Sequence, residues 1–420
     1  MVARRGASFP RAGGALAAGG ADGGVGTDAT KPAGPCYLRF MFGPVTTPAI
    51  KVAGAPRPAA ARQAGIAASR SPYRLFGGFR LLLACMVMLQ HFQYLLPETE
   101  RPLFSHFGFG VTAVAVFFVI SGFIVAEANE TFYAARPGAF LCNRLLRVVP
   151  PYLAALALSV LLHEALWRAG LLRLWDFAPE TSPVTPEQVL AGVVSLLPGA
   201  RAGALIGGFE FVPFVWSLRV ELAFYLLAAV AFQAVDILSR RAGPAVARAA
   251  GVGLLLACFA VFAIWRVRGG PLLIGDLPCF LFGVTVYRFW RQPGPGAALA
   301  ALVALACTLL GFAAWQQRGQ PVLADQVPVL LGLFALFGLL TTLRAAPRWQ
   351  GIDKALGALS YPLYLNHYVV GIGLYDLTAQ RGFGLYALGA ALSLLLAAVM
   401  HWGLEVPLAP LRTRIRGTPL

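Results

Sequence analysis

Charged side chains are scarce in this sequence, since Asp, Glu, Lys and Arg together make up 12% of its 420 residues. Soluble domains carry roughly a quarter charged residues, so this chain has too little polar surface to cover a water-soluble globule of its length. The hydrophobic share of 58% also excludes a chain that is disordered throughout, because disordered chains are poor in apolar residues. The composition therefore indicates a polytopic membrane protein.

Lysine is nearly absent, and the net charge of +16 comes almost entirely from arginine. Such a charge can indicate a nucleic-acid partner, but here the arginines lie in short connections between apolar runs, which is typical of cytoplasmic loops of membrane proteins. We therefore expect a lipid bilayer as partner and no nucleic acid. The six cysteines show no CxxC spacing, and no zinc, nucleotide-loop or haem motif is present, so we expect neither a metal nor a bound cofactor.

Two kinds of sequence follow one another along the chain. Residues 1–70 are rich in Gly, Ala and Pro without a sustained apolar run, which predicts a disordered tail. An all-α membrane domain is predicted over 71–410, followed by a short basic cytoplasmic tail over 411–420. Because one helical crossing takes about 20 apolar residues, the domain holds ten predicted transmembrane helices: 79–96, 109–128, 148–168, 212–236, 245–265, 272–290, 297–315, 326–343, 356–375 and 384–404.

Arginine is unevenly distributed between the two sets of connections that these ten segments leave. One set carries pairs such as Arg240–Arg241 and Arg288 with Arg291, whereas the other set is poorer in arginine. The excess of positive charge on one side places both termini in the cytoplasm. The long connection 169–211 is then outside, and its weakly apolar stretch 189–197 predicts a half-buried or re-entrant helix.

The first predicted membrane helix carries two ionisable residues. Arg80 and His91 are eleven residues apart, so they lie on one helix face about 16 Å apart along the axis. Ionisable residues inside apolar segments are costly and are often functional. The alternatives are an interfacial anchor for Arg80 and a helix-packing hydrogen bond for His91.

Two further polar groups break the apolar pattern. Ser217, Glu221 and Tyr225 follow an i, i+4, i+8 spacing and form one polar stripe on a helix. A buried carboxylate needs a partner, so Glu221 belongs either to an internal ion pair or to a site. Arg144 and Arg147 place two guanidinium groups on one helix face, where they suit phosphate but can also act as membrane-surface anchors.

These stretches, taken in order, resemble the membrane acyltransferase family 3, the integral-membrane O-acyltransferases of bacterial surface polysaccharides. The resemblance rests on six short motifs, which are Arg80 to His91 (Arg-x10-His), Phe117 to Phe123 (FFxxSGF), Arg144 to Arg147 (RxxR), Trp216 to Tyr225 (WSLxxE–FY), Ser360 to His367 (SYxxYLxH) and Glu405 to Pro407 (ExP). Members often carry Gly-Val-Asp before the FF, whereas this chain has Ala113-Val-Ala115 and no acidic residue there.

The resemblance implies transfer of an acyl group, commonly acetyl, from acyl-CoA to a hydroxyl of a cell-surface or lipid-linked glycan, in the bacterial cytoplasmic membrane. His fits the general base, because its pKa lies near neutrality. The resemblance assigns His91 as base, Glu221 as a group that orients or charges the site, and Arg80, Arg144 and Arg147 as donor contacts. The expected supporting residues are Ser121, Trp216, Ser217, Tyr225, Tyr364 and His367.

Two other functions account for part of the pattern. A transporter or flippase of a glycolipid or small solute explains the spans and the intramembrane His and Glu, but it gives the arginine pair no role beyond anchoring. A non-catalytic membrane scaffold explains the spans alone, since it needs no stripe of buried ionisable groups.

Overall fold

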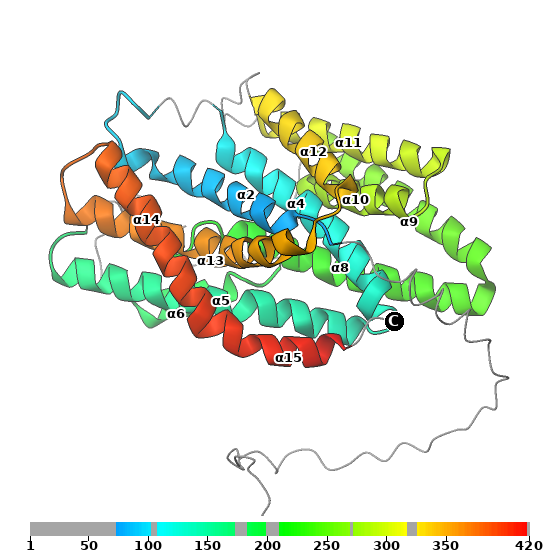
Figure 1. Ribbon diagram of the computed structural model, residues 1–420, viewed down its shortest axis with the longest axis horizontal. Coiled ribbons are helices and arrows are strands. Elements are labelled where there is room, and N and C mark those ends of the chain that lie inside the picture. The colour runs from blue at the N-terminus through cyan, green and yellow to red at the C-terminus, as the bar shows by residue number, and fades with distance from the viewer. Residues whose placement is uncertain are drawn as a thin grey trace, which may run out of the picture. The chain divides into compact units, whose positions relative to one another are not determined.

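The computed structural model describes residues 73–101, 107–172, 183–198, 210–268, 272–316 and 326–417. The chain divides into two units, 1–58 and 59–420, and all of the described residues belong to the second. The tail predicted over 1–70 lies outside the described residues. Within the described ranges the regular secondary structure is entirely helical, as Figure 1 shows.

The helices follow one another closely along the chain, and short 3₁₀ or π-helical turns extend three of them. Their bounds are α2 (Phe76–His91), η1 (Phe92–Leu95), α4 (Phe109–Ala128), η2 (Asn129–Tyr133), α5 (Pro137–Arg168), α6 (Pro186–Val194), α8 (Val215–Ala242), α9 (Pro244–Arg268), α10 (Leu272–Arg291), α11 (Pro295–Gln316), α12 (Gln326–Thr342), α13 (Pro347–Leu377), α14 (Phe383–Met400), η3 (His401–Glu405) and α15 (Val406–Arg416).

Each of the ten predicted membrane segments coincides with a helix, which confirms the all-α polytopic class. Six described helices are long and apolar enough to cross a membrane, and they span Phe109–Tyr133, Pro137–Arg168, Val215–Ala242, Pro244–Trp265, Pro295–Phe312 and Phe383–Arg416. The other four segments are α2, α10, α12 and α13, of which α2 has 16 residues and α12 has 17. Ten full crossings therefore stay a prediction.

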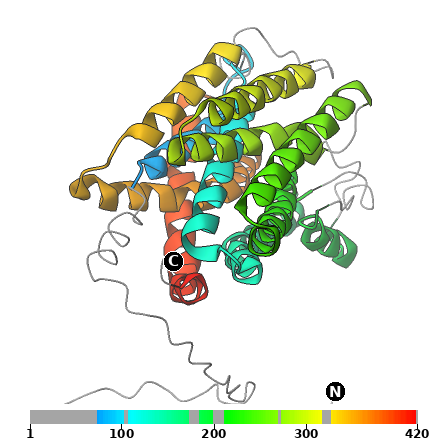
Figure 2. The same ribbon diagram turned by 90° about the vertical axis from the view of Figure 1, so that its right-hand side faces the viewer.

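The structure changes the predicted limits at two places that matter for the site. Helix α5 begins at Pro137, eleven residues before the predicted segment, so Arg144 and Arg147 lie within a continuous helix. At the other end of the chain, the predicted basic tail from 411 is helical to Arg416, as the second half of α15. Helix α15 lies against α5 in both views (Figures 1 and 2).

Close approach of backbones sets two helix pairs. A Cβ atom built on Gly122 of α4 would lie 2.0 Å from the carbonyl oxygen of Phe280 in α10, and one on Gly77 of α2 would lie 1.8 Å from the carbonyl oxygen of Asp353 in α13. Only glycine fits such contacts, which are common where membrane helices pack tightly. Helices α2 and α13 therefore pack with their backbones close together. Helix α2 carries His91 and α13 carries His367.

The side chain of Asp353 fixes α2 against α13 at their shared end. Its carboxylate accepts hydrogen bonds from the backbone amides of Gly77 and Gly78, at 2.8 and 2.7 Å, and from the Tyr73 hydroxyl at 2.8 Å. The first amides of a helix have no partner within the helix, so this carboxylate caps α2 from a neighbouring helix. The axial register of α2 on α13 follows from this cap.

Candidate active site

A partly open cavity lies between helices α2, α4, α5, α8 and α13, with about 750 Å³ of empty space when its open mouth is included. Eight of the eleven predicted site residues line it: Arg80, Ser121, Arg144, Arg147, Ser217, Glu221, Tyr225 and Tyr364. They come from five helices that are distant in sequence, so the motifs converge on one space. Most of the remaining lining is apolar, with Val114, Phe117 and Phe118 among it.

The Glu221 carboxylate is held by hydroxyl groups. Ser121 of α4 donates a hydrogen bond to its Oε1 atom at 2.7 Å, and Tyr225, one turn further along α8, donates to the same oxygen. Among the described residues no ion pair includes Glu221, so the internal ion pair considered from the sequence is not formed. The nearby Arg219 instead pairs with Glu210, at 3.2 Å.

The arginines of the cavity are packed against aromatic rings. The guanidinium of Arg144 lies 5.4 Å from the ring centre of Phe140 and 5.3 Å from that of Tyr225, within the range of a cation–π contact. Arg144 is 8% exposed, and it shares the cavity lining with Arg80 and Arg147. In the described part of the chain none of these three arginines takes part in an ion pair. Arg80 and Arg147 are half-buried. Guanidinium groups that are removed from water and have no carboxylate partner favour an anionic ligand.

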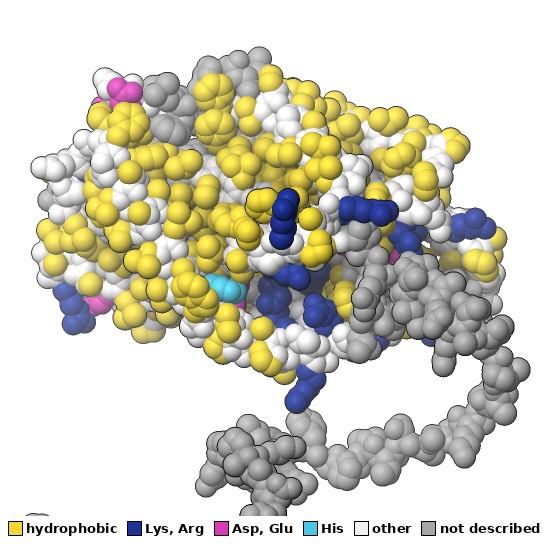
Figure 3. Space-filling model, viewed as in Figure 1, with side chains coloured by type: hydrophobic (Ala, Val, Ile, Leu, Met, Phe, Trp, Pro, Cys, Tyr) yellow, Lys and Arg dark blue, Asp and Glu magenta, His cyan; other side chains and the backbone are white. Residues whose placement is uncertain are grey.

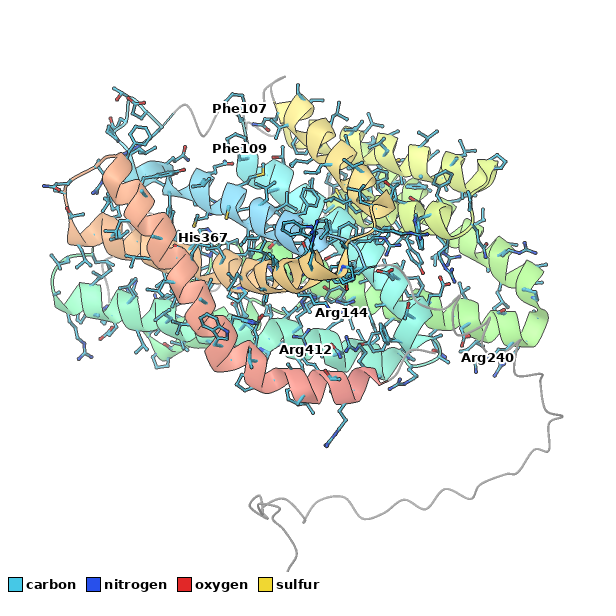
Figure 4. All side chains as sticks on the ribbon, in the orientation of Figure 1. Phe107, Phe109, Arg144, Arg240, His367 and Arg412 are labelled. Atoms are coloured by element: carbon cyan, nitrogen blue, oxygen red, sulfur yellow. The ribbon has the colours of Figure 1, made fainter. Side chains whose placement is uncertain are left out.

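His91 and His367 form a direct pair between α2 and α13. The Nδ1 atom of His91 lies 2.7 Å from Nε2 of His367, and Nδ1 of His367 lies 3.1 Å from the Leu363 carbonyl oxygen. Because a carbonyl only accepts, His367 carries its proton on Nδ1 and accepts at Nε2. His91 then donates from Nδ1, and its own Nε2 is left with a free lone pair. His367 is fully buried within the bundle, and its place there is labelled in Figure 4.

Phe214 connects the histidine pair to the cavity. Its ring stacks on His367 at 4.8 Å and on His91 at 5.6 Å between ring centres. Its carbonyl oxygen accepts a hydrogen bond from Ser217 at 2.9 Å, and the Ser217 hydroxyl lies 2.7 Å from that of Tyr364. Ser217 and Tyr364 line the cavity. The Tyr364 ring lies 6.3 Å from that of His367 and 5.3 Å from that of Phe214 between centres, so Tyr364 and Phe214 lie between the cavity and the histidine pair.

Three of the predicted site residues do not line the cavity: His91 and His367 form the pair beside it, and Trp216 faces a different space. Trp216 lines a second cavity of about 430 Å³ together with Asp276 and Cys279, and its ring meets Phe118 edge to face at 6.5 Å between centres. Neighbours on a helix point about 100° apart, so Trp216 and Ser217 face different spaces. Trp216 therefore does not support the main site as expected, but lies beside it.

Three residues at or next to the site are absent from the set predicted from the sequence. Tyr361 lines the cavity and donates a hydrogen bond to the Val148 carbonyl at 3.0 Å. It precedes Tyr364 by three residues, so helical spacing alone could have found it. Phe214 lies before the predicted motif. Arg412 lies close to the arginine pair, since its carbonyl oxygen accepts a hydrogen bond from Asn143, the residue before Arg144, at 2.7 Å. In the described ranges no group of three His, Cys, Asp or Glu residues is placed to hold a metal.

Comparison with known proteins finds relatives along most of the chain. The model of a protein family described as “Acyltransferase domain” matches residues 76–402. Nodulation protein 10 of Rhizobium leguminosarum bv. viciae is 26% identical over 361 residues, which cover 81% of this chain and 94% of that protein. Exopolysaccharide production protein ExoZ of Rhizobium meliloti (strain 1021) is 28% identical over 265 residues, or 62% of this chain and 77% of that protein. No solved structure matches significantly.

Proposed function

The chain belongs to the membrane acyltransferase family whose domain spans residues 76–402, and from this premise we propose that it transfers an acyl group from acyl-CoA to a glycan hydroxyl. One observation carries the proposal. A single cavity is lined both by three arginines that have no ion-pair partner in the described chain and by Tyr364, whose ring centre lies 6.3 Å from that of His367. A phosphate-bearing thioester has both an anionic end and a reactive end, and such a cavity offers a place for each.

The donor occupies this cavity lengthwise in our proposal. Guanidinium forks bind phosphate oxygens with two parallel hydrogen bonds, so Arg80, Arg144 and Arg147 suit the phosphates of coenzyme A. Arg80 and His91 are about 16 Å apart along α2, a separation that suits the long pantetheine arm between phosphate and thioester. The side with the arginines then faces the cytoplasm, where acyl-CoA is made, and both termini lie on that side.

His91 is the general base of the proposed reaction. Its unprotonated Nε2 takes the proton of the acceptor hydroxyl while that oxygen attacks the thioester carbonyl. The new C–O bond forms, the C–S bond breaks, and the proton passes from His91 to the departing thiolate. His367 accepts the hydrogen bond from Nδ1–H of His91, so it keeps the ring in the productive tautomer and stabilises the imidazolium as it forms.

Glu221 has a positioning role in this scheme. It accepts hydrogen bonds from Ser121 and Tyr225, and the Tyr225 ring supports the Arg144 guanidinium. The carboxylate therefore orders the donor end of the cavity through Tyr225, with no proton transfer of its own. Ser121, Ser217 and Tyr364 complete the polar lining along which the thioester lies.

The acceptor is a glycan or lipid-linked sugar in this proposal, and the acyl group is acetyl. The names of the two Rhizobium relatives refer to nodulation and to exopolysaccharide production, which supports an extracellular sugar polymer or its precursor. The protein then works in the bacterial cytoplasmic membrane, with the acceptor reaching the histidine pair from the face opposite the arginines.

Purified protein in lipid nanodiscs, supplied with radiolabelled acetyl-CoA, tests the proposal. Membrane glycans from a strain that lacks the protein serve as acceptor. We expect release of free CoA that depends on the acceptor, with the label recovered on glycan hydroxyls. Absence of both signals contradicts the acyl-CoA donor. A glycolipid flippase would instead move sugar across sealed proteoliposomes without consuming acetyl-CoA, and a scaffold would do neither.

A further inference from the structure

We propose that Arg412, in the C-terminal helix α15, is a further donor-binding residue that completes the phosphate site with Arg144 and Arg147. The inference rests on the proposed function and deepens it. Arg412 lies beyond residue 402, where the match to the family's domain ends.

Hydrogen bonds to the backbone fix α15 on α5. The Asn143 side-chain amide donates to the carbonyl oxygen of Arg412 at 2.7 Å. The Arg136 guanidinium donates to the carbonyl oxygens of Ile415 at 2.9 Å and of Arg416 at 3.2 Å. Asn143 directly precedes Arg144, so the backbone of Arg412 is tied to the turn of α5 that carries the arginine pair. Figure 4 labels Arg144 and Arg412 near the place where the two helices meet.

The Arg412 side chain is poorly satisfied by the protein itself. Its Nε atom is buried and has no hydrogen-bond partner within the described residues. An unsatisfied buried donor is costly, the more so on a charged group, and native proteins rarely leave one without a ligand or water. The positive charges of Arg147 and Arg144 also act on Arg412, and that of Arg147 acts on Arg80. The negative charge of Glu405 offsets part of this repulsion at both residues, and that of Glu221 offsets part of it at Arg80. Arg412 is thus a fourth positive charge close to the three that line the cavity.

The nearby carboxylates do not pair with these four arginines. Glu405 is bonded to His401, whose Nδ1 lies 2.8 Å from its Oε2 atom, and Glu221 is occupied by two hydroxyl groups. In the part of the chain that the structure describes, no ion pair includes Arg80, Arg144, Arg147 or Arg412. An anion with several phosphate oxygens would supply the missing acceptors and relieve the repulsion. Figure 3 shows Lys or Arg side chains gathered in a recess on the face where Figure 4 labels Arg144 and Arg412.

Two sources could supply such phosphate oxygens: the coenzyme A donor and an anionic lipid headgroup. Arg80, Arg144 and Arg147 line one cavity together with the polar residues of the site, which favours the donor. The donor also offers phosphates at two places, the pyrophosphate and the 3′-phosphate, which matches the spread of four guanidinium groups over α2, α5 and α15.

The test compares Arg412→Gln with Arg414→Gln, a matched control because Arg414 is exposed on the same helix. The KM of each variant is measured for acetyl-CoA, acetyl-dephospho-CoA and acetyl-pantetheine, in nanodiscs of zwitterionic lipid and again with anionic lipid added. We expect Arg412→Gln to raise the KM for acetyl-CoA about 10- to 150-fold, because the substitution removes a hydrogen bond between two charged groups. The KM for acetyl-pantetheine, which has no phosphate, should match that of the wild type. Arg412→Lys should restore part of the loss.

Three results overturn the inference. An unchanged KM for acetyl-CoA removes Arg412 from the donor site, and an equal rise with acetyl-pantetheine shows a loss of fold in place of a lost phosphate contact. An effect that appears only with anionic lipid assigns the anion to the membrane. Binding of free CoA to the wild-type protein distinguishes failure of the Arg412 proposal from failure of the proposed acyltransferase function. A wild-type protein that neither binds CoA nor uses acetyl-CoA refutes the proposed function, whereas normal wild-type activity with an unaffected variant refutes only the role of Arg412.

Discussion

Replacing His91 by glutamine separates hydrogen bonding from proton transfer at the histidine pair. In the wild-type structure His91 donates from Nδ1 to Nε2 of His367 over 2.7 Å. A glutamine amide can donate to the same acceptor, so much of the packing between α2 and α13 should survive. It has no nitrogen lone pair that accepts a proton near neutral pH, so His91→Gln should lose the base and keep the fold.

The two contributions differ enough in size for an experiment to separate them. Loss of a general base costs about 100- to 10,000-fold in rate. One interhelical hydrogen bond in a membrane protein contributes about 0.6 kcal/mol on average, so even its full loss should shift thermal unfolding only slightly. The assay is transfer of label from acetyl-CoA to the glycan acceptor, normalised to folded protein, alongside a melting curve for each variant.

Variants of His367 supply the comparison. His367→Gln offers a carbonyl oxygen that can accept from His91 Nδ1–H, whereas His367→Ala leaves that donor unpaired. Loss of one buried partner costs about 1–3 kcal/mol, or about 5- to 150-fold in rate if it acts on the transition state. We expect His367→Gln to retain more activity than His367→Ala, and both to exceed His91→Gln.

The role of His91 is refuted if His91→Gln keeps more than about a tenth of the wild-type rate, which lies well above the range for loss of a base. His367 would then be the next candidate. A large loss of thermal stability in His91→Gln would show that the ring acts mainly in packing.

Three further predictions address the donor end, the membrane orientation and the helix cap. Arg144→Ala and Arg147→Ala should each raise the KM for acetyl-CoA about 10- to 150-fold with partial rescue by Lys, and unchanged values would reduce the pair to membrane anchors. Reporter fusions after the C-terminus and within 169–211 should read cytoplasmic and external, and an external C-terminus would contradict the predicted topology. Asp353→Ala should destabilise the fold by about 0.5–2 kcal/mol, since it removes the cap of α2, whereas an unchanged melting temperature would show that the cap contributes nothing.

Local features of the sequence determined the fold class and most of the polar residues that line the cavity. Transfer of apolar side chains out of water depends on composition over about 20 residues, so the ten helical segments could be drawn without any knowledge of packing. Helical periodicity is also local, and it correctly placed Ser217, Glu221 and Tyr225 on one face that lines the cavity. The same applies to Arg144 and Arg147, whose spacing brings both into that cavity.

The partners of those residues were decided only by the tertiary structure. The histidine pair joins positions 276 residues apart, Glu221 meets Ser121 across 100 residues, and the contact of Arg412 with the α5 side chain Asn143 spans 269. Trp216, next to Ser217 in the chain, faces a different cavity. Such pairings depend on the axial register and rotation of each helix against its neighbours. Register is set by close contacts such as that between Gly77 and the Asp353 backbone, and a single sequence carries no local pattern that names the opposing residue.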